Sequence, residues 1–303
     1  MVLTNNMTRK FIVFINPISG TDTKEKLCLL LAYAMQAAGY MFEVLPTDAE
    51  GNYHWLPQKI KDENITEVVI CGGDGTISQI IAHLLNVNVG IGIIPMGSGN
   101  GLALAAGIPT DTNKALAIIM HGNRISVDGF YINDRFSCML SGVGFDAQVA
   151  ADFAVDGERG LKTYIKQSYR NFHKATAFPF IITLDKITIS TEAFCINIAN
   201  GNQYGNHITI APKAQLSDGL IDVVIIKKMS KLKLVISLVT HLVFGKPEPA
   251  GYYHKKDILY YQVKSLSINN PALAPLHIDG EPAATAAHFN IKILPAAFSL
   301  LVS

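Results

Sequence analysis

The sequence is poor in charge, although it is rich in apolar residues. Charged side chains make up 16% of the 303 residues, and 25 basic against 24 acidic side chains leave a formal net charge of +1. A nucleic-acid-binding protein needs a marked basic excess, so we expect no nucleic acid among its partners. Hydrophobic residues reach 49%, which excludes a largely disordered chain.

Cysteines and long apolar runs are also scarce. The four cysteines, Cys28, Cys71, Cys138 and Cys195, form no Cys-x-x-Cys pair and lie in apolar runs, which indicates a reducing compartment. The longest apolar stretch, 232–244, is shorter than the roughly 20 residues that a membrane-spanning helix needs. Because the first residues lack the apolar core of a signal peptide, we expect a cytoplasmic protein that touches membranes only peripherally.

Two common nucleotide-binding signatures are missing as well. The chain has no Gly-x-x-x-x-Gly-Lys-Ser/Thr motif, so it is not a P-loop kinase. It also lacks Gly-x-Gly-x-x-Gly after its first predicted strand, which argues against a Rossmann dehydrogenase.

The first third of the chain alternates short apolar runs with segments of helical periodicity. We expect strands at residues 11–15, 41–45, 68–71 and 89–94, and helices at 24–38, 56–62, 76–85 and 112–121. Strands that alternate with helices form a parallel sheet covered on both faces. The pattern predicts an α/β fold with an N-terminal three-layer α/β domain, residues 1–124.

After residue 124 the apolar runs become short, β-branched and separated by turn residues, as is typical of antiparallel strands. They occur at 125–127, 136–140, 181–184, 187–190, 194–200, 219–226 and 265–268. Two predicted helices, 161–175 and 232–245, interrupt them. We therefore predict a C-terminal antiparallel β-sandwich domain with helical insertions, residues 125–286, and a tail, 287–303, that packs back on the first domain.

Three glycine-rich segments, 16–20, 72–76 and 95–101, follow predicted parallel strands, where ligands bind in open α/β sheets. Glycine lets the backbone approach a phosphate, and the N-terminus of the following helix attracts negative charge. Asp74 would repel a phosphate unless a magnesium ion lay between them. Ordinary strand–helix turns are the alternative, but the repetition and this carboxylate favour phosphate binding.

Two further acids, Asp279 and Glu281, flank Gly280. One carboxylate could take a proton from an attacking hydroxyl group while the other orients that acid or holds a metal. An ordinary surface β-turn is the alternative, since Asp-Gly is common in such turns.

Together these motifs resemble the diacylglycerol kinase catalytic-domain family, which includes bacterial lipid kinases and sphingosine and ceramide kinases. The resemblance covers nearly the whole chain and rests on Asn16-Pro-x-Ser-Gly20, Gly72-Gly-Asp-Gly-Thr76, Pro95-x-Gly-Ser-Gly-Asn100 and Asp279-Gly-Glu281. Gly-Gly-Asp-Gly-Thr also occurs in NAD kinases, whereas the full set is specific to the lipid kinases.

The resemblance implies both the ATP-binding residues and the catalytic acids. The implied ATP contacts are Asn16, Pro17, Ser19, Gly20, Thr47, Gly72, Gly73, Asp74, Gly75, Thr76, Ser78, Gly97, Ser98 and Asn100. Glu281 matches the proton acceptor of bacterial members, whereas sphingosine kinases more often place the base at the position of Asp74. Glu281, Asp279 and Asp74 are therefore the candidate catalytic residues, and which of them is the base stays open.

The resemblance also implies a magnesium site in the second domain. Asp218 would supply its carboxylate, and Gln215 and Leu220 their backbone carbonyls, which are oxygen ligands that suit Mg²⁺. Alternatively, Asp218 is an ordinary turn residue that binds no metal. Asp128 matches a position where members keep an aspartate, and we consider it a contact of the substrate headgroup.

Two departures from the family pattern leave the acceptor lipid open. Gly101 follows Asn100 where many bacterial diacylglycerol kinases have aspartate. Thr21 follows Gly20 where they often have a basic residue, and Lys24 is the basic residue one turn later.

Two segments of the second domain suit a membrane surface. Basic residues recur at four-residue spacing and predict a helical stripe formed by Lys162, Lys166, Arg170 and Lys174. The apolar segment 232–244 is flanked by lysines. Both features fit an anionic lipid interface, with a solvated helix face and ordinary core packing as the alternatives.

We therefore expect an ATP-dependent lipid kinase that transfers the γ-phosphoryl group of MgATP to a hydroxyl of diacylglycerol or a sphingoid base, as in phospholipid biosynthesis. Its expected partners are the lipid and a peripheral membrane surface, and a homodimer is also considered. One alternative is a kinase for a soluble hydroxyl substrate such as NAD. The other is a lipid-binding protein with an inactive kinase site.

Overall fold

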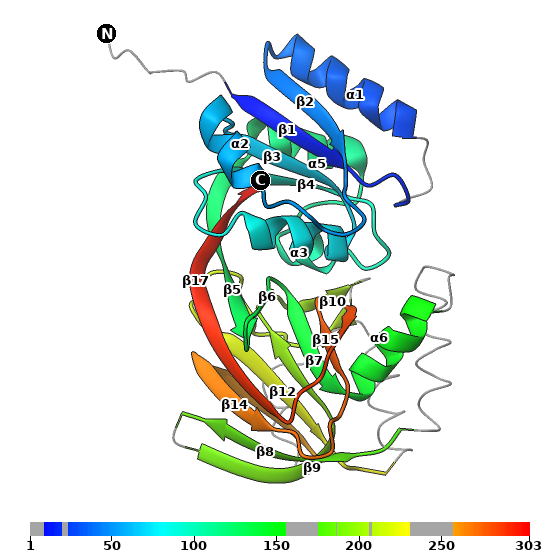
Figure 1. The fold of residues 1–303 in the computed structure, drawn as a ribbon, viewed down its shortest axis with the longest axis vertical. Coiled ribbons are helices and arrows are strands. Elements are labelled where there is room, and N and C mark those ends of the chain that lie inside the picture. Colours follow the sequence, from blue (N-terminus) through cyan, green and yellow to red (C-terminus); the bar gives the residue numbers. More distant parts are fainter. Residues whose placement is uncertain (1–8, 20–23, 156–174, 186, 206–207, 231–256) are drawn as a thin grey trace. The chain divides into compact units, whose positions relative to one another are not determined.

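The computed structural model describes residues 9–19, 24–155, 175–185, 187–205, 208–230 and 257–303, which form two units (Figure 1). One unit comprises the residues up to Gly97, with Ala106–Val127 and Ala297–Ser303. The other comprises Ser98–Ala105 and Asp128–Ala296. The predicted helices at 161–175 and 232–245, with the basic stripe, lie outside the described residues except for Ala175.

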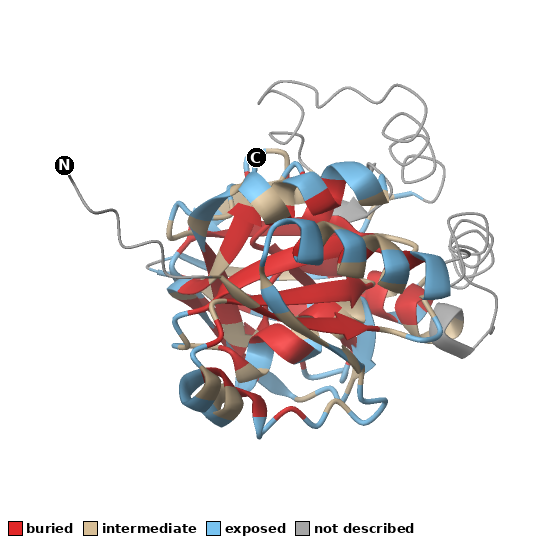
Figure 2. Cartoon of the chain, turned by 90° about the horizontal axis from the view of Figure 1, so that it is seen from above, coloured by how far each residue is buried: buried red, intermediate tan, exposed pale blue. Residues whose placement is uncertain are grey.

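The first unit is built on a parallel sheet. Its strands follow one another in the order β2 (Met41–Pro46), β1 (Lys10–Ile15), β3 (Glu67–Gly72), β4 (Gly90–Pro95) and the end of β17 (His288–Val302). Every residue of β3 and β4 is buried, so both faces of the sheet are covered (Figure 2). These strands are continuous apolar runs because neither face meets water. The expected parallel α/β sheet is confirmed.

The helices of this unit are α1 (Lys24–Ala37), α2 (Leu56–Glu63), α3 (Asp74–His83) and α5 (Thr112–His121). The bounds of α5 agree with the sequence prediction, because Asp111 is a strong N-cap whose side chain accepts a hydrogen bond from the Lys114 amide at 2.9 Å. Helix α3 begins at Asp74, two residues earlier than predicted. Asp74 therefore lies in the first helical turn rather than in a loop.

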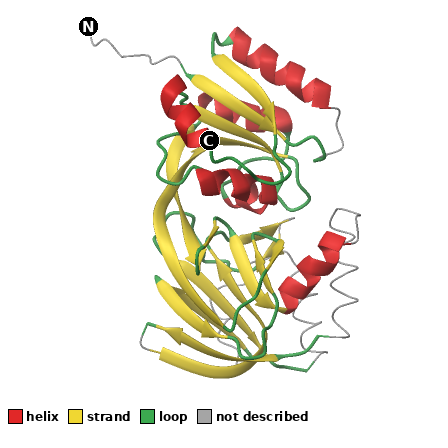
Figure 3. Ribbon diagram, viewed as in Figure 1, coloured by secondary structure: helices red, strands yellow, loops and turns green. Residues whose placement is uncertain are grey.

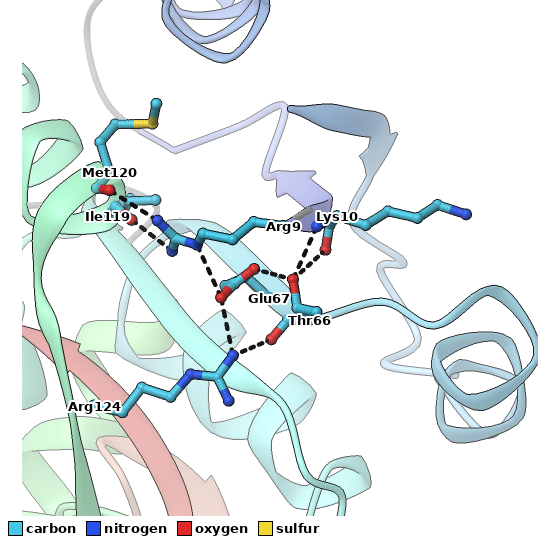
Figure 4. A network of polar contacts seen from close by, with 7 residues as sticks. All are labelled: Arg9, Lys10, Thr66, Glu67, Ile119, Met120 and Arg124. Carbon is cyan, nitrogen blue, oxygen red and sulfur yellow. Dashed lines mark hydrogen bonds and ion pairs between the residues drawn. The ribbon is translucent and has the colours of Figure 1, made fainter. Parts of the chain in front are cut away.

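A buried carboxylate ties together the amino ends of β1 and β3 and the C-terminus of α5 (Figure 4). Glu67 is 3% exposed, and its Oε1 accepts from Arg9 Nε at 3.0 Å and from Arg124 at 2.9 Å. The Arg9 guanidinium also donates to the carbonyls of Ile119 and Met120, both at 2.8 Å. A cation suits this position because the carbonyl end of a helix is negative.

Glu67→Ala is expected to destabilise the first unit by about 2 kcal/mol, because Arg9 and Arg124 lose a buried acceptor to which both are hydrogen-bonded. Denaturant unfolding followed by the fluorescence of Trp55, the one tryptophan of the chain, measures this loss. The control is Glu43→Ala, which breaks a more exposed pair with Lys59 and should cost less than about 1 kcal/mol. Equal losses in the two variants would contradict the role of Glu67.

The second unit consists mainly of antiparallel strands (Figure 3). They are β6 (Arg135–Ser137), β7 (Leu140–Gly144), β8 (Phe178–Leu184), β9 (Ile187–Ala199), β12 (Ile221–Lys227), β13 (Ile258–Val263), β14 (Ser265–Asn269), β15 (Leu276–Ile278), β16 (Glu281–Ala283), the part of β5 (Asn123–Ile132) from Asp128 on, and most of β17. The main path runs β16-β15-β7-β9-β8-β14-β17; β12 pairs with β9 and β13, and β5 with β17 and β6. Side chains from most of these strands share one core, which includes Phe130, Phe180, Ile196 and Phe289. The expected antiparallel C-terminal domain is confirmed.

Several short elements of this unit differ from the sequence prediction. The expected strand 136–140 is interrupted at Cys138 and Met139, whose amides bind a distant side chain instead of a neighbouring strand. Strand β9 is continuous where two strands were predicted, because its polar residues around Glu192 lie on an exposed face. Helices α4 (Gly101–Ala105) and α6 (Phe145–Val155) and the small ladder of β10 (Gln203–Gly205) and β11 (Ile208–Thr209) were not predicted.

The cysteines behave as apolar side chains. All four are free, and Cys71, Cys138 and Cys195 are buried. Burial raises the pKa of the Cys71 and Cys195 thiols, which keeps them protonated. Within the described ranges, no helix is long and apolar enough to cross a membrane.

Candidate functional site

Three predicted nucleotide loops meet at one edge of the parallel sheet. Ile15 pairs with Pro46 and with Cys71, and Gly72 pairs with Pro95, so β2, β1, β3 and β4 end side by side. The Thr47 amide donates to the carbonyl of Ile15 at 3.1 Å, which holds Thr47 beside the end of β1. The residues that follow these strands therefore line a single edge.

Direct contacts join the loops to one another. Asn16 Nδ2 donates to Thr76 Oγ1 at 2.8 Å, which links the first loop to the second. A Cβ on Gly73 would lie 3.0 Å from the Cα of Gly97, so the second and third loops touch through their backbones. A Cβ on Gly72 would similarly meet Thr76. Part of the glycine pattern is thus required by packing between the loops.

Asp74 lies at the N-terminus of α3, where the N-cap is Gly73 and no side chain caps the helix. The helix end favours an anion, and Asp74 is partly exposed there. Thr76, Gly75 and Ser78 belong to the same helix, with Ser78 one turn further on. The arrangement provides backbone amides for a phosphate and one carboxylate for a cation.

The first loop is held by its own side chains. Asn16 Oδ1 accepts from the Ile18 amide at 3.0 Å, and Lys24 Nζ donates to the carbonyl of Ser19. Lys24, at the start of α1, therefore contacts this loop. Pro17 is exposed, and Gly20 lies outside the described residues.

The third loop passes from one unit to the other. Gly97 belongs to the first unit, whereas Ser98 and Asn100 belong to the second. Asn100 is buried with a φ of 52°, and its carbonyl accepts from the Leu104 amide at 2.9 Å. A Cβ on Gly101 would lie 2.3 Å from Met139 Sδ and 3.3 Å from the carbonyl oxygen of Gln203, so a larger residue here would have to displace Met139.

Asp279 is buried, and its carboxylate is fully engaged. Oδ1 accepts from Ser137 Oγ at 2.7 Å and from the amides of Met139 and Leu140 at 3.0 Å. Oδ2 accepts from the Cys138 amide at 3.0 Å. Since its acceptor sites are occupied by the backbone of residues 138–140, this carboxylate is placed to hold the turn.

Glu281 differs sharply from Asp279 although it is two residues away. It is exposed, and its carboxylate makes no hydrogen bond or ion pair with the described residues. Asp279 and Gly280 have φ values of 48° and 84°, and Ile278 pairs with Glu281. Positive φ at both central residues is the condition for a type I′ hairpin turn. The turn thus holds one acid in the interior and presents the other to solvent.

Asp128 organises the turn that contains Asp218. Its Oδ2 accepts from the Gly219 amide at 2.7 Å and its Oδ1 from the Ala296 amide at 2.8 Å. Its own amide donates to the carbonyl of Leu216 at 2.7 Å. Asp128 is only 3% exposed, so these contacts favour a positioning role over the predicted contact with substrate.

The Asp218 turn is the predicted magnesium site, and its one carboxylate is open to solvent. Asp218 is exposed, and one of its oxygens accepts from the Leu220 amide at 3.0 Å. Nearby Asp222 is buried, and its Oδ2 has no hydrogen-bond partner among the described residues. Burial, and secondarily the charge of Asp218, raises the pKa of the Asp222 carboxyl to about 6, against the lowering effect of the Tyr260 hydroxyl.

This ligand set depends on backbone carbonyls. No group of three His, Cys, Asp or Glu side chains with metal-binding geometry occurs within the described ranges. The carbonyls of Gln215 and Leu220 would have to complete the site with Asp218. Such a set suits Mg²⁺ or Ca²⁺ rather than a transition metal.

Two family descriptions match consecutive parts of the chain. Residues 10–132 match the family described as "Diacylglycerol kinase catalytic domain". Residues 140–302 match the family described as "YegS C-terminal NAD kinase beta sandwich-like domain". The chain belongs to the diacylglycerol kinase catalytic-domain family.

Individual members of this kinase family align along most of the chain. "Probable lipid kinase YegS-like" of Shewanella frigidimarina is 27% identical over 282 residues, which cover 89% of this chain and 87% of that protein. "Diacylglycerol kinase" of Staphylococcus carnosus is 23% identical over 91% of this chain and 89% of its own. A crystal structure of a diacylglycerol kinase from Bacillus anthracis str. Sterne has a TM-score of 0.76 at 19% identity and covers 98% of each chain. That structural likeness shows a shared fold.

Three polar residues of this kinase-family chain were missed by the sequence analysis. His277 and Asp146 are buried and lie beside the Asp279–Gly280 turn, and Asp222 is buried beside the Asp218 turn. The only sequence signal for them is a polar residue inside an otherwise apolar run, as in Leu276-His277-Ile278. A buried polar residue must have partners, but the sequence does not say which.

Proposed function

We propose that this protein is a kinase that transfers the γ-phosphoryl group of MgATP to a hydroxyl group of a lipid, of the diacylglycerol or sphingoid type. The observation that carries the proposal is the joined set of loops in the first unit, where Asn16 contacts Thr76 and Gly73 packs on Gly97. This set offers backbone amides and the N-terminus of α3 to phosphates, and Asp74 to a cation. The lipid acceptor is proposed from the names of the relatives.

Each acid receives a separate role. Glu281 takes the proton of the attacking hydroxyl, whose oxygen bonds to the γ-phosphorus while the bond to the β-phosphate oxygen breaks and ADP leaves. Asp279 holds the turn that carries Glu281. This role is supported by its carboxylate, whose oxygens already accept hydrogen bonds from residues 137–140. Asp74 would hold Mg²⁺, which offsets the negative charge of the phosphates when it is bound. Asp74 remains the alternative base.

The test is transfer of label from [γ-³²P]ATP to a panel of acceptors. The panel contains diacylglycerol in detergent micelles, a sphingoid base in the same micelles, NAD, and micelles alone. We expect label in a lipid product and none in NAD. Label in NAD would instead favour a soluble acceptor, a possibility that the NAD kinase-like description of the second family keeps open. Binding of ATP without transfer to any acceptor would favour a lipid-binding protein with an inactive site.

A second prediction concerns the cation on the Asp218 turn. We expect saturating Mg²⁺ to raise the melting temperature of the wild-type protein, because a ligand at 100 times its dissociation constant stabilises the folded state by about 2.7 kcal/mol. In Asp218→Ala this increase should disappear, and activity should fall through lost order in the turn. The control is Asp134→Ala, which removes another exposed acid of the same unit. If the melting temperature of Asp218→Ala responds to Mg²⁺ as the wild type does, the metal assignment is wrong.

A further inference from the structure

We infer that the buried pair of Asp146 and His277 is a positioning device for the turn that carries Glu281. The inference rests on the proposed function, because Glu281 is the proposed base. His277 lies in β15 and has no exposed surface, and Asp146, in the first turn of α6, is 7% exposed. His277 Nε2 is 3.3 Å from Asp146 Oδ2.

The contacts of His277 determine its tautomer. The Gly280 amide donates to His277 Nδ1 at 3.3 Å, so Nδ1 must be the unprotonated nitrogen. Nε2 then carries the hydrogen and donates to Asp146, in the way that a carboxylate orients a functional histidine. The ring therefore connects Asp146 to the backbone of the turn.

Space for this pair is reserved by a glycine. Gly142 of β7 lies opposite His277 in the sheet. A Cβ at position 142 would lie 1.9 Å from Asp146 Oδ2 and 2.6 Å from His277 Nε2. Any other residue would push the two groups apart.

The turn is consequently held at both central residues. Residues 137–140 bind the carboxylate of Asp279, and His277 binds the amide of Gly280. Glu281 follows directly, so its backbone position is determined while its side chain stays exposed. A hydrophobic residue at 277 would fill the core at least as well, because burying polar groups carries a desolvation cost. The polar pair is therefore better explained by the orientation of the turn than by stability.

Two matched variants separate the two bonds of His277. In His277→Asn the side-chain oxygen replaces Nδ1, which keeps the bond to Gly280 and loses that to Asp146. In His277→Gln the amide replaces Nε2, which keeps the bond to Asp146 and leaves Gly280 without an acceptor. Both variants keep a polar side chain in the site. Asp146→Asn, which preserves the shape of the partner, tests the same link from the other side.

The first measurement is hydrogen exchange at the Gly280 amide, which requires no activity. Exchange should accelerate in His277→Gln and stay near the wild-type rate in His277→Asn. Equal exchange rates in the two variants would overturn the inference. If the wild type phosphorylates no acceptor, the proposed function fails, and this measurement still decides whether His277 holds the turn.

The second measurement is turnover, with ATP affinity determined separately. His277→Gln should lower turnover by about 10-fold to 100-fold, because a displacement of a catalytic group by about 1 Å has an effect of this size. ATP affinity should stay unchanged. His277→Asn should stay close to the wild type, and Asp146→Asn should fall between the two. In a Glu281→Gln background His277→Gln should have no further effect, because no base remains to be positioned. The same fold loss in both backgrounds would show that His277 acts independently of Glu281 and would overturn the inference.

Discussion

Asp74→Ala is expected to reduce phosphoryl transfer by far more than tenfold while the protein stays folded. The carboxylate lies at the N-terminus of α3, beside the linked pair of Asn16 and Thr76, where it would repel a phosphate unless a cation lay between them. The fold should tolerate the change because Gly73, not Asp74, is the N-cap and alanine is a good helix former. The free energy of unfolding should fall by only roughly 0.3–1 kcal/mol, which is what an acidic residue in the first turn of a helix contributes.

The measurement compares turnover and nucleotide binding with and without Mg²⁺. Asp74→Ala should weaken the binding of MgATP but not that of ATP alone, since removing a negative charge reduces repulsion. Asp74→Asn keeps the shape without the charge and should behave similarly. Asp62→Ala, which removes an exposed acid of α2 in the same unit, is the control and should act as wild type. If Asp74→Ala keeps more than about a tenth of wild-type turnover, a loss under roughly 1.4 kcal/mol, the assignment fails.

Glu281→Gln is expected to lower turnover by about 10²-fold to 10⁴-fold, the usual value of general-base catalysis. Glutamine keeps the size and the hydrogen-bonding capacity of the side chain but cannot accept the proton. ATP affinity should stay nearly unchanged because only proton transfer is affected. Turnover and ATP binding are measured separately, and a melting curve shows that the fold is retained.

Asp279→Asn is the matched variant on the same turn, and its expected result differs. Four oxygen and nitrogen donors face the Asp279 carboxylate, and an amide group can no longer accept from all of them. We expect a lower melting temperature, and disturbed loop geometry that weakens nucleotide binding as well as turnover. If Glu281→Gln turns over normally while Asp279→Asn loses only the chemical step, the two roles are reversed.

Much of the first unit was predictable because its determinants are local. Helix α5 has the predicted bounds since Asp111 caps it, and the strands β3 and β4 are apolar runs that end in glycine-rich segments. Once these strands are parallel, their carboxyl ends must share an edge, so the proximity of the three loops follows from topology. The second unit was predicted less well, because short strands such as β15 have few residues to reveal a period.

The sequence by itself determined the fold class, the alternation of strands and helices in the first unit, and the acids that flank Gly280. Tertiary structure alone decided which of those acids is buried, because the amides that saturate Asp279 come from residues 138–140, about 140 positions earlier in the chain. It likewise brought His277 to Asp146, 131 positions away, and placed Ser98–Ala105 in the second unit. Such contacts leave no trace in local periodicity, since a hydrogen bond depends on how distant strands pair and not on the residues beside it.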